Sequence, residues 1–334
     1  MVKVFCIDIG YSLKTKCRRW EESVTSYPGQ ALYGINHFKK FGVEPVFEWC
    51  EHNDFYGKWY LVFDEVIKLI SLIKFRNDYD LIYVPHAHYS RWLIILKQLK
   101  IINRPIVVCM HNKNNLYRLI KGCDFVITIN PSLLDKLKQQ FNPSKVRYIP
   151  LLPEQITEFG AESEFKYDII SIGNTYRDYR ILVEAMADLS YNCLIVTSQV
   201  LKDIPMNVTV INDKLEYSEC LRLYRQAKVI VLPVLAEAQE GVFGLTSLID
   251  ALYVEKPVII TRTKGMGISV EKNNLGLEVN VADADSLRQA ICQLMLDEEK
   301  RQSISYNIKK FKKENSMEKS AEEICSVFRE IVRK

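Results

Sequence analysis

The feature that most constrains the fold is an alternation of short apolar runs with amphipathic stretches along nearly the whole chain. The runs are rich in Val and Ile, which is typical of strands buried in a parallel sheet. The strands expected on this basis are 2–9, 45–49, 81–84, 106–110, 125–129, 147–150, 168–172, 193–197, 208–211, 229–233 and 257–261. Such an alternation predicts an α/β fold in which helices cover parallel sheets.

The stretches between the runs have the spacing of apolar residues that is typical of helices. The expected helices are 30–41, 59–75, 132–140, 180–189, 218–227, 245–252, 286–296 and 303–334. The first of them is followed by Gly42, and glycine is a frequent helix stop.

The alternation is interrupted over 151–165, where four Glu, Pro153 and Gly160 accompany weak periodicity. We interpret this segment as a linker. It divides the chain into two expected domains, 1–155 and 165–305, which suits a length of 334 residues. In open parallel sheets ligands bind at the carboxyl ends of the strands, and a cleft between two domains is the default active site.

Composition limits the cellular setting. The nine cysteines include no Cys-x-x-Cys pair, and several lie within apolar runs, as buried free thiols do. The apolar N-terminal run is too short for a signal peptide, and no apolar run reaches the length of about 18 residues that a membrane-spanning helix needs. These features predict a reduced, cytoplasmic protein.

Charge is unevenly distributed. Residues 1–160 hold 22 Lys and Arg against 15 Asp and Glu, whereas the remainder holds 23 against 26. A basic N-terminal half suits an anionic partner such as the inner face of a membrane, although a solvated surface explains it equally well. The stretch Lys14–Trp20 could rest on a membrane, bind a lipid-linked diphosphate acceptor or be a solvated loop. No nucleic-acid-binding motif is present, so no nucleic acid partner is expected.

The segment 237–261 carries the clearest chemical signal. Gly241 and Gly244 allow the backbone to approach a ligand closely. The amides at the start of the following helix would face an anion such as a diphosphate, and Thr246 could cap this helix or donate to a phosphate. Asp250 lies one to two turns further on, where its carboxylate could accept the two hydroxyl groups of a ribose or face solvent.

This segment resembles the donor-binding segment of retaining GT-B glycosyltransferases, in particular family 4 (group 1). The resemblance rests on Phe243-Gly244-Leu245, Asp250-Ala251-Leu252 and Lys256-Pro257-Val258-Ile259, which follow in the family's order. It implies that Asp250 is the ribose-binding acid, with Asp where the family usually has Glu. The donor site expected around it includes Phe243, Gly244, Leu245 and Thr246.

One position departs from the family pattern. The family has a further acidic residue eight positions before the acid that corresponds to Asp250. This chain has Val242 at that position. Glu240 and Glu237 lie further upstream, so the loop is expected to be one or two residues longer. We predict that Glu240 contacts the transferred sugar, with Glu237 as the alternative.

Weaker landmarks of the same family follow in order along the chain. They are 27–30 (a glycine-rich first loop), 41–46, 106–111, 125–132, 145–150, 171–178 and 221–233. The resemblance implies a GT-B fold, in which two Rossmann-like domains with parallel sheets face each other across a cleft. The N-terminal domain would bind the acceptor, and the C-terminal domain would bind the nucleotide sugar. A helix over 306–334 would cross back to the N-terminal domain. It also implies that Gly29 and Gly173 belong to the donor site.

Histidines follow two of the expected strands. His111 ends the run 106–111, where a packed or capping role is common, but the resemblance implies a hydrogen bond to the transferred sugar. His86 and His88 follow the strand 81–84. Their spacing would suit a metal, but no third ligand is apparent nearby, and acceptor contact is the hypothesis that we keep.

Arg177 is the predicted partner of the leaving diphosphate. A positive group must offset the negative charge that develops as the diphosphate departs, and Arg177 follows Gly173 closely. The family's usual lysine partner is absent, and Lys202 and Lys264 are the candidates to replace it.

Two Asp-x-Asp patterns, Asp78 with Asp80 and Asp283 with Asp285, raise the alternative of a metal-dependent GT-A enzyme. Both have local explanations, because Asp80 directly precedes a strand and Asp285 is placed to cap a helix. GT-B enzymes generally work without a bound metal, so we expect no metal and no cofactor.

The expected function is that of a retaining glycosyltransferase of the hexosyltransferase type. It would move a sugar from a nucleotide donor, most commonly UDP-linked in the family, to a glycan or lipid-linked acceptor in polysaccharide or glycoconjugate biosynthesis. Val242 keeps open a non-catalytic subunit of the same fold. A nucleotide-sugar epimerase is the third interpretation, and donor turnover with and without acceptor distinguishes the three.

Overall fold

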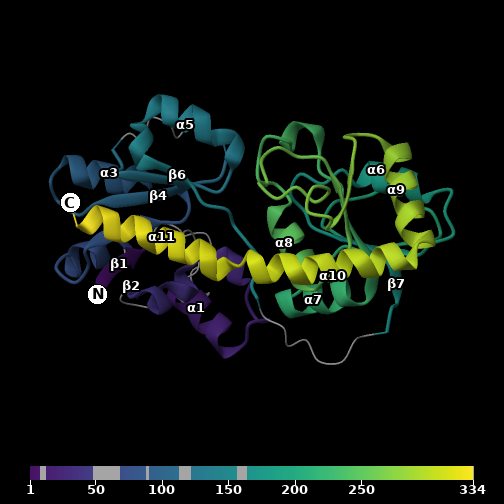
Figure 1. The fold of residues 1–334 in the computed structure, drawn as a ribbon, viewed down its shortest axis with the longest axis horizontal. Helices are drawn as coiled ribbons and strands as arrows, with labels where there is room; N and C mark the ends of the chain where they lie inside the picture. Colours follow the sequence, from purple (N-terminus) through teal and green to yellow (C-terminus); the bar gives the residue numbers. More distant parts are fainter. Residues whose placement is uncertain (8–12, 48–67, 88–89, 113–121, 156–163, 334) are drawn as a thin grey trace. The chain divides into compact units, whose positions relative to one another are not determined.

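The computed structural model describes residues 1–7, 13–47, 68–87, 90–112, 122–155 and 164–333. The chain divides into two compact units (Figure 1). Unit 1 comprises Met1–Leu151 and Met317–Lys334, and unit 2 comprises Leu152–Ser316. Each unit contains one six-stranded sheet in which every pair of neighbouring strands is parallel. The predicted α/β fold with two parallel sheets is therefore confirmed.

The sheet of unit 1 has the strand order β2-β1-β3-β4-β5-β6. Its strands are β1 (Val2–Cys6), β2 (Val43–Val46), β3 (Leu81–Val84), β4 (Ile106–Met110), β5 (Phe125–Thr128) and β6 (Val146–Tyr148). β3, β4 and β5 are buried at every position, as expected for apolar runs covered on both faces. The ends of the predicted strands 2–9 and 45–49, and most of the predicted helix 59–75, lie outside the described residues.

Helices cover both faces of this sheet. They are α1 (Leu13–Glu22), η1 (Gly29–Leu32), η2 (Ile35–Phe41), a helix over 68–74, α3 (Ser90–Gln98), η5 (Pro131–Leu133), α5 (Leu134–Gln140), η6 (Pro143–Lys145) and α11 (Met317–Val332), where η denotes a 3-10 helix. The predicted helix over 30–41 is divided in two because Tyr33 and Gly34 have positive φ angles of 49° and 84°. Its predicted end at Gly42 is confirmed. The basic stretch Lys14–Trp20 lies on α1.

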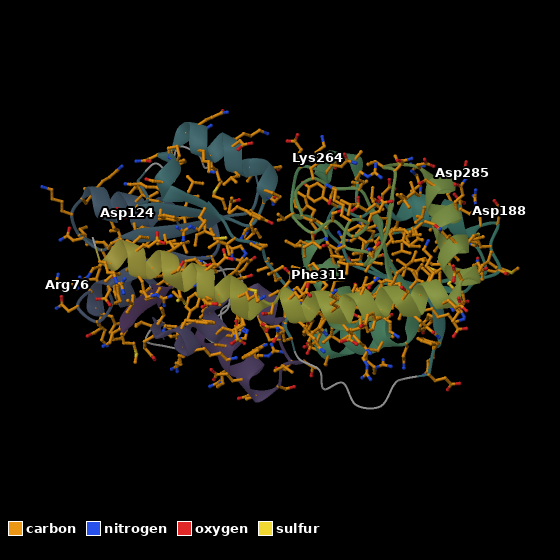
Figure 2. All side chains as sticks on the ribbon, in the orientation of Figure 1. Arg76, Asp124, Asp188, Lys264, Asp285 and Phe311 are labelled. Carbon is orange, nitrogen blue, oxygen red and sulfur yellow. The ribbon has the colours of Figure 1, made fainter. Side chains whose placement is uncertain are left out.

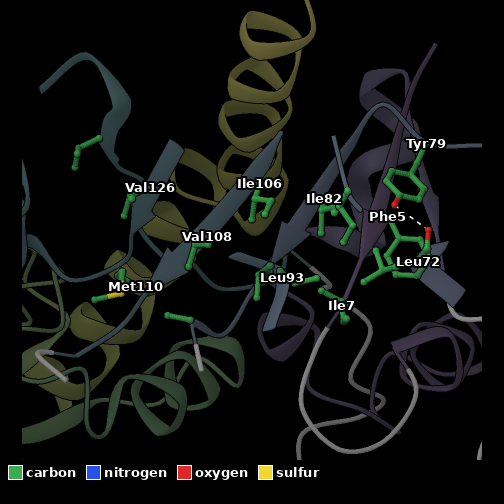
Figure 3. Packing of buried hydrophobic residues seen from close by; sticks show 14 of the residues in the cluster. Phe5, Ile7, Leu72, Tyr79, Ile82, Leu93, Ile106, Val108, Met110 and Val126 are labelled. Atoms are coloured by element: carbon green, nitrogen blue, oxygen red, sulfur yellow. Dashed lines mark hydrogen bonds between the residues drawn. The ribbon is translucent and has the colours of Figure 1, made fainter. Parts of the chain in front are cut away.

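One apolar cluster joins the sheet of unit 1 to the helices on one of its faces. Phe5, Ile82, Ile106 and Val108 of the strands pack in this cluster with Leu72 of the helix over 68–74 and Leu93 of α3 (Figure 3). The Phe328 ring of α11 packs against the rings of Phe38 and Tyr83 at centroid distances of 5.4 and 5.2 Å. α11 therefore belongs to the core of unit 1, although it is last in the sequence.

The sheet of unit 2 has the strand order β12-β11-β10-β7-β8-β9. Its strands are β7 (Tyr167–Ile172), β8 (Cys193–Val196), β9 (Val208–Ile211), β10 (Ala227–Leu232), β11 (Val258–Thr261) and β12 (Gly276–Val279). β12 is absent from the sequence prediction because Gly276 and Glu278 interrupt its apolar character. A Cβ atom at Gly276 would overlap the backbone of Val258, so glycine lets this edge strand approach β11.

The helices of unit 2 are α6 (Tyr179–Met186), α7 (Tyr217–Arg225), the 3-10 helix η7 (Ala236–Ala238), α8 (Leu245–Tyr253), α9 (Ala284–Leu296) and α10 (Glu298–Glu314). The cap of α9 is Asp283, whose carboxylate accepts a hydrogen bond from the Ser286 amide at 2.8 Å. The prediction that Asp285 caps this helix is wrong, because Asp285 lies within the first turn and pairs with Arg288.

The C-terminal tail consists of two helices. α10 belongs to unit 2, where the Lys312 ammonium donates to the Tyr253 carbonyl at 2.9 Å and to the Glu255 carboxylate at 3.0 Å. α11 belongs to unit 1, where the Ser320 hydroxyl donates to the Pro150 carbonyl at 2.7 Å. No helix in the described part of the chain is both long enough and apolar enough to cross a membrane.

Candidate functional site

The loops that follow β7, β8 and β10 are tied together at the carboxyl edge of the unit 2 sheet. Arg177 and Val234 form an antiparallel bridge between the first and the third of these loops. In the second loop, the Gln199 side chain donates to the Asn174 carbonyl at 3.0 Å, and the Ser198 amide donates to the Asn174 side chain at 2.6 Å. These bonds fix Arg177 at the edge of the sheet where open α/β sheets bind their ligands.

Arg177 is a buried cation, with 5% of its surface exposed. Its guanidinium donates to the Thr175 carbonyl at 3.0 Å and to the Ser247 hydroxyl at 2.9 Å. In the described part of the chain its Nε has no hydrogen-bond partner and no carboxylate compensates its charge. Burial lowers the pKa of Arg177, because the charged form loses solvation. A buried cation without a counter-charge favours the binding of an anion.

Two glycines make room for the Arg177 guanidinium. A Cβ atom at Gly173 would lie 3.0 Å from Nε of Arg177, and Gly173 has a φ of 151° that side chains rarely adopt. A Cβ atom at Gly244 would lie 3.5 Å from the guanidinium and only 2.9 Å from Met266, and its φ is 92°. Of the three predicted donor-site glycines, Gly173 and Gly244 therefore lie next to Arg177, whereas Gly29 lies on η1 of unit 1.

The start of α8 presents backbone donors near this cation. Gly244 is the cap residue and has no side chain that could accept from the first turn. Leu245 donates its amide to the Val242 carbonyl at 3.1 Å, and its side chain is buried. Among the described residues no acceptor is recorded for the amides of Thr246 and Ser247, and the Thr246 side chain is exposed. This helix start can therefore donate to an anion held by Arg177.

Asp250 lies one turn beyond Ser247 on the same face of α8. Its carboxylate accepts a hydrogen bond from the Tyr217 hydroxyl at 2.9 Å. Burial, followed by the charge of Asp250, raises the pKa of Tyr224 well above its ordinary value. Tyr217 was missed in the sequence, although its place at the first position of α7, after the carboxyl end of β9, could have indicated it.

The loop before α8 is braced by the loop after β11. The amides of Lys264 and Gly265 donate to the Gln239 carbonyl at 2.9 and 3.3 Å, and Lys264 is labelled in Figure 2. A Cβ atom at Gly265 would overlap the Gly241 carbonyl and lie 2.7 Å from that of Glu240. The side chain of Glu240 is exposed, as is that of Glu237.

Phe243, in the loop before α8, contacts the loop that follows β7. Its ring lies against the ring of Tyr176, with centroids 4.1 Å apart. Tyr176 has a φ of 52° and directly precedes Arg177. The aromatic contact therefore adds to the bridge that holds Arg177 beside the start of α8.

Unit 1 carries a separate cluster of three rings. Tyr33 stacks on His111 at a centroid distance of 5.0 Å and shares a hydrogen bond of 3.0 Å with Nε2 of His86. The two histidine rings meet edge to face at 4.8 Å. Tyr33 directly follows η1, which begins at Gly29. The predicted residues His86 and His111 are thus connected through Tyr33, a residue that the sequence analysis missed.

His88 lies outside the described residues. Among the described residues no group of three or more His, Cys, Asp or Glu side chains could hold a metal ion. Asp80, from the first Asp-x-Asp pattern, accepts a hydrogen bond from the Lys3 amide at 2.8 Å. Asp283, from the second, caps α9.

Comparison with known proteins agrees with the geometry of unit 2. The family model of glycosyl transferases group 1 matches residues 201–311, a range that includes the braced loop and α8. Over this range the chain is similar to the group 1 glycosyltransferases. A protein of Methanocaldococcus jannaschii described as an uncharacterized glycosyltransferase is 26% identical over 159 residues. That alignment covers 45% of this chain and 44% of the archaeal protein, less than half of either.

Solved structures of glycosyltransferases share the fold over the whole chain. Sucrose-phosphate synthase from Thermosynechococcus elongatus has a TM-score of 0.72 at 14% identity and covers 99% of both chains. Anabaena HepE in complex with UDP-glucose has a TM-score of 0.68 at 12% identity and covers 99% of this chain and 100% of its own. WaaG, a glycosyltransferase involved in lipopolysaccharide biosynthesis, has a TM-score of 0.60 at 11% identity, with 98% and 99% covered. The predicted GT-B fold is therefore confirmed.

Proposed function

We propose that this chain is a retaining glycosyltransferase that uses a nucleoside diphosphate sugar as its donor. The observation that carries the proposal is Arg177, a buried cation that lies against the start of α8 and has no carboxylate partner among the described residues. A diphosphate supplies the missing counter-charge. Because negative charge grows on the diphosphate as the glycosidic bond breaks, the same contact stabilises the transition state.

The nucleoside would be held by Asp250. Its carboxylate lies on the face of α8 that also carries Ser247, the hydrogen-bond partner of Arg177. A ribose bound to Asp250 would place the diphosphate towards Arg177. UDP is the preferred nucleotide in this proposal, because the structure of Anabaena HepE, which shares the fold, contains UDP-glucose.

We assign the sugar contact in the braced loop to Glu240, and a hydrogen bond to the transferred sugar to His111. The acceptor would be a glycan or a lipid-linked saccharide, with His86 and His88 as its contacts. The family resemblance supports retention of the anomeric configuration and a reaction without a metal.

Donor binding is tested first by the melting temperature of the protein with UDP-, GDP- and ADP-sugars. A ligand at 100 times its dissociation constant adds about 2.7 kcal/mol to the stability. We expect a rise with UDP-sugars that Asp250→Ala abolishes. If no nucleotide sugar raises the melting temperature, the proposed donor site is wrong and a non-catalytic subunit of the same fold is favoured.

Catalysis is tested by donor consumption with and without a mixture of glycan and lipid-linked acceptors. A transferase consumes the donor faster when its acceptor is present. Isomerisation of the donor sugar without any acceptor would instead identify an epimerase and contradict the proposal. The α- or β-configuration of the product, read by NMR, tests retention.

A further inference from the structure

Two helices of unit 1, the helix over 68–74 and α3, carry apolar residues both on the face toward the core and on the face toward solvent. Leu69 and Leu72 of the helix over 68–74, and Leu93 of α3, pack into the core. Other aliphatic side chains of the same segments point to solvent with 36% to 64% of their surface exposed, namely Ile70, Ile73, Ile95, Leu99 and Ile101. A surface helix normally has a single apolar stripe, so a second one indicates a surface that another body covers.

These exposed side chains lie where two helices reach the same edge of the sheet. The helix over 68–74 leads into β3 and α3 leads into β4, and Ile82 of β3 pairs with Ile106 of β4. The Tyr79 hydroxyl donates to the Leu72 carbonyl at 3.0 Å (Figure 3), and the charge of Arg104 acts on the same tyrosine. The segments before β3 and β4 are therefore adjacent. This edge holds the amino ends of the strands, whereas His86 and His111 follow the carboxyl ends.

The charge around these side chains is mainly positive. Lys74, Arg76 and Lys100 are exposed, and Arg76 is labelled in Figure 2. Lys97 is neutralised by its ion pair with Asp124. The exposed acidic residue within 68–80 and 93–104 is Asp78, since Asp80 is half-buried and accepts from the Lys3 amide.

We propose that this apolar and basic face docks on an anionic lipid surface. Aliphatic side chains would enter the interfacial layer while Lys74, Arg76 and Lys100 contact the negative head groups. A second copy of the chain would fit this face less well than a lipid surface. A symmetric contact between two copies would place the same positive charges against one another. The inference does not depend on the donor chemistry of unit 2.

The basic stretch on α1 is less suited to this role. Lys16 is buried, and the Arg19 guanidinium donates to the Ser26 carbonyl at 3.2 Å. Arg18 pairs with Glu22 within the same helix. These charges are partly used inside unit 1, and none of the exposed large hydrophobic residues of the described chain lies on α1. Lys74, Arg76 and Lys100 accompany exposed aliphatic side chains.

Co-sedimentation of the full chain with vesicles tests the proposal. We expect binding to phosphatidylcholine vesicles that contain phosphatidylglycerol, little binding to phosphatidylcholine alone, and release by high salt. Lys100→Asn should weaken the partition coefficient about fivefold, since one basic residue near the surface contributes about 1 kcal/mol. Asn suits the positive φ of 58° at this position. Leu99→Ser should weaken the partition coefficient about tenfold, because it removes apolar surface that the lipid layer would bury.

Matched controls use exposed residues elsewhere. Lys138→Gln on α5 removes one exposed charge of unit 1, and Met206→Ser removes one exposed apolar side chain of unit 2. Both should bind vesicles as the wild type does, and unchanged melting temperatures would show that all four variants fold. Failure of the wild type to bind either vesicle, or equal losses in the controls, would overturn the proposal. So would a concentration-dependent dimer that Leu99→Ser dissociates, because a second copy would then cover this face.

Discussion

The Arg177 guanidinium donates a hydrogen bond to the Ser247 hydroxyl at 2.9 Å, which joins the loop after β7 to the first turn of α8. The two residues are 70 positions apart in the sequence. Their contact brings a buried cation to a helix N-terminus, and both features attract anions. A diphosphate bound there would be held by side-chain and backbone donors together.

The Asp250 carboxylate should distinguish ribose from deoxyribose. We expect the wild type to bind UDP about fivefold or more tightly than 2′-deoxy-UDP, because the carboxylate loses a hydrogen-bond partner in the second complex. In Asp250→Ala the two affinities should become nearly equal. Titration calorimetry with both nucleotides measures the ratio.

The Tyr217 hydroxyl should act through Asp250. Tyr217→Phe removes the 2.9 Å hydrogen bond and should reduce the preference for ribose without abolishing UDP binding. Tyr306→Phe, at an exposed position of α10, is the matched control and should leave the preference unchanged. A full preference in Tyr217→Phe would mean that Asp250 is oriented by other contacts.

Gly265 should matter more for turnover than for nucleotide binding. In Gly265→Ala the new Cβ atom displaces the backbone of Glu240 and Gly241, while Arg177 and Asp250 lie outside this loop. Misplacement of a catalytic contact by about 1 Å can lower the rate about 100-fold. We therefore expect kcat for sugar transfer to fall at least about tenfold with a small change in UDP affinity.

Thr263→Ala, two residues away, is the control for this loop because it adds no atom near Glu240. It should retain wild-type kcat. If Gly265→Ala lowered UDP affinity as strongly as kcat, the braced loop would contact the nucleotide rather than the sugar.

The cap of α9 gives a pH-dependent stability. Hydrogen bonds from the Ser286 amide and from Asn280 lower the pKa of Asp283 below its ordinary value of 3.8. The carboxylate therefore stabilises the fold fully above about pH 4, and this contribution is lost as pH falls through the lowered pKa. Asp283→Ala should melt below the wild type at pH 7, and the difference should shrink in acid.

Two further variants separate capping from charge. Asp283→Asn should retain most of the stability at pH 7, because Asn also caps helices, and should lose the acid dependence of this site. Asp285→Ala should have a smaller effect at pH 7, since Asp285 forms an exposed ion pair with Arg288. A larger loss in Asp285→Ala than in Asp283→Ala would contradict the assignment of the cap.

Much of the fold follows from local pattern. β3 and β4 have the bounds predicted from their apolar runs, because a strand buried on both faces needs an unbroken run of large side chains. β12 escaped prediction because its edge position tolerates Gly276 and Glu278. The division at Tyr33 and Gly34 escaped because a tyrosine with positive φ depends on tertiary contacts with His86 and His111.

The candidate site was predictable where a residue type has few alternatives. Gly173 and Gly244 have backbone angles that favour glycine, and Arg177 follows one of them closely in the sequence. Tyr217 was not predictable in the same way, because its contact with Asp250 joins two helices that are distant in the sequence. For Glu240, contact with the transferred sugar rests on the sequence pattern alone. The structure adds that its side chain is exposed.

The most direct test of the account is calorimetric titration of UDP into the wild type and into Arg177→Met. Met keeps an unbranched side chain but removes the buried charge, so the protein without ligand should melt at or above the wild-type temperature. One charge-assisted hydrogen bond contributes about 1.5–3 kcal/mol, so UDP should bind roughly 10- to 100-fold more weakly to the variant. Equal affinity of the two proteins for UDP would contradict the account, because Arg177 would then not be the partner of the diphosphate.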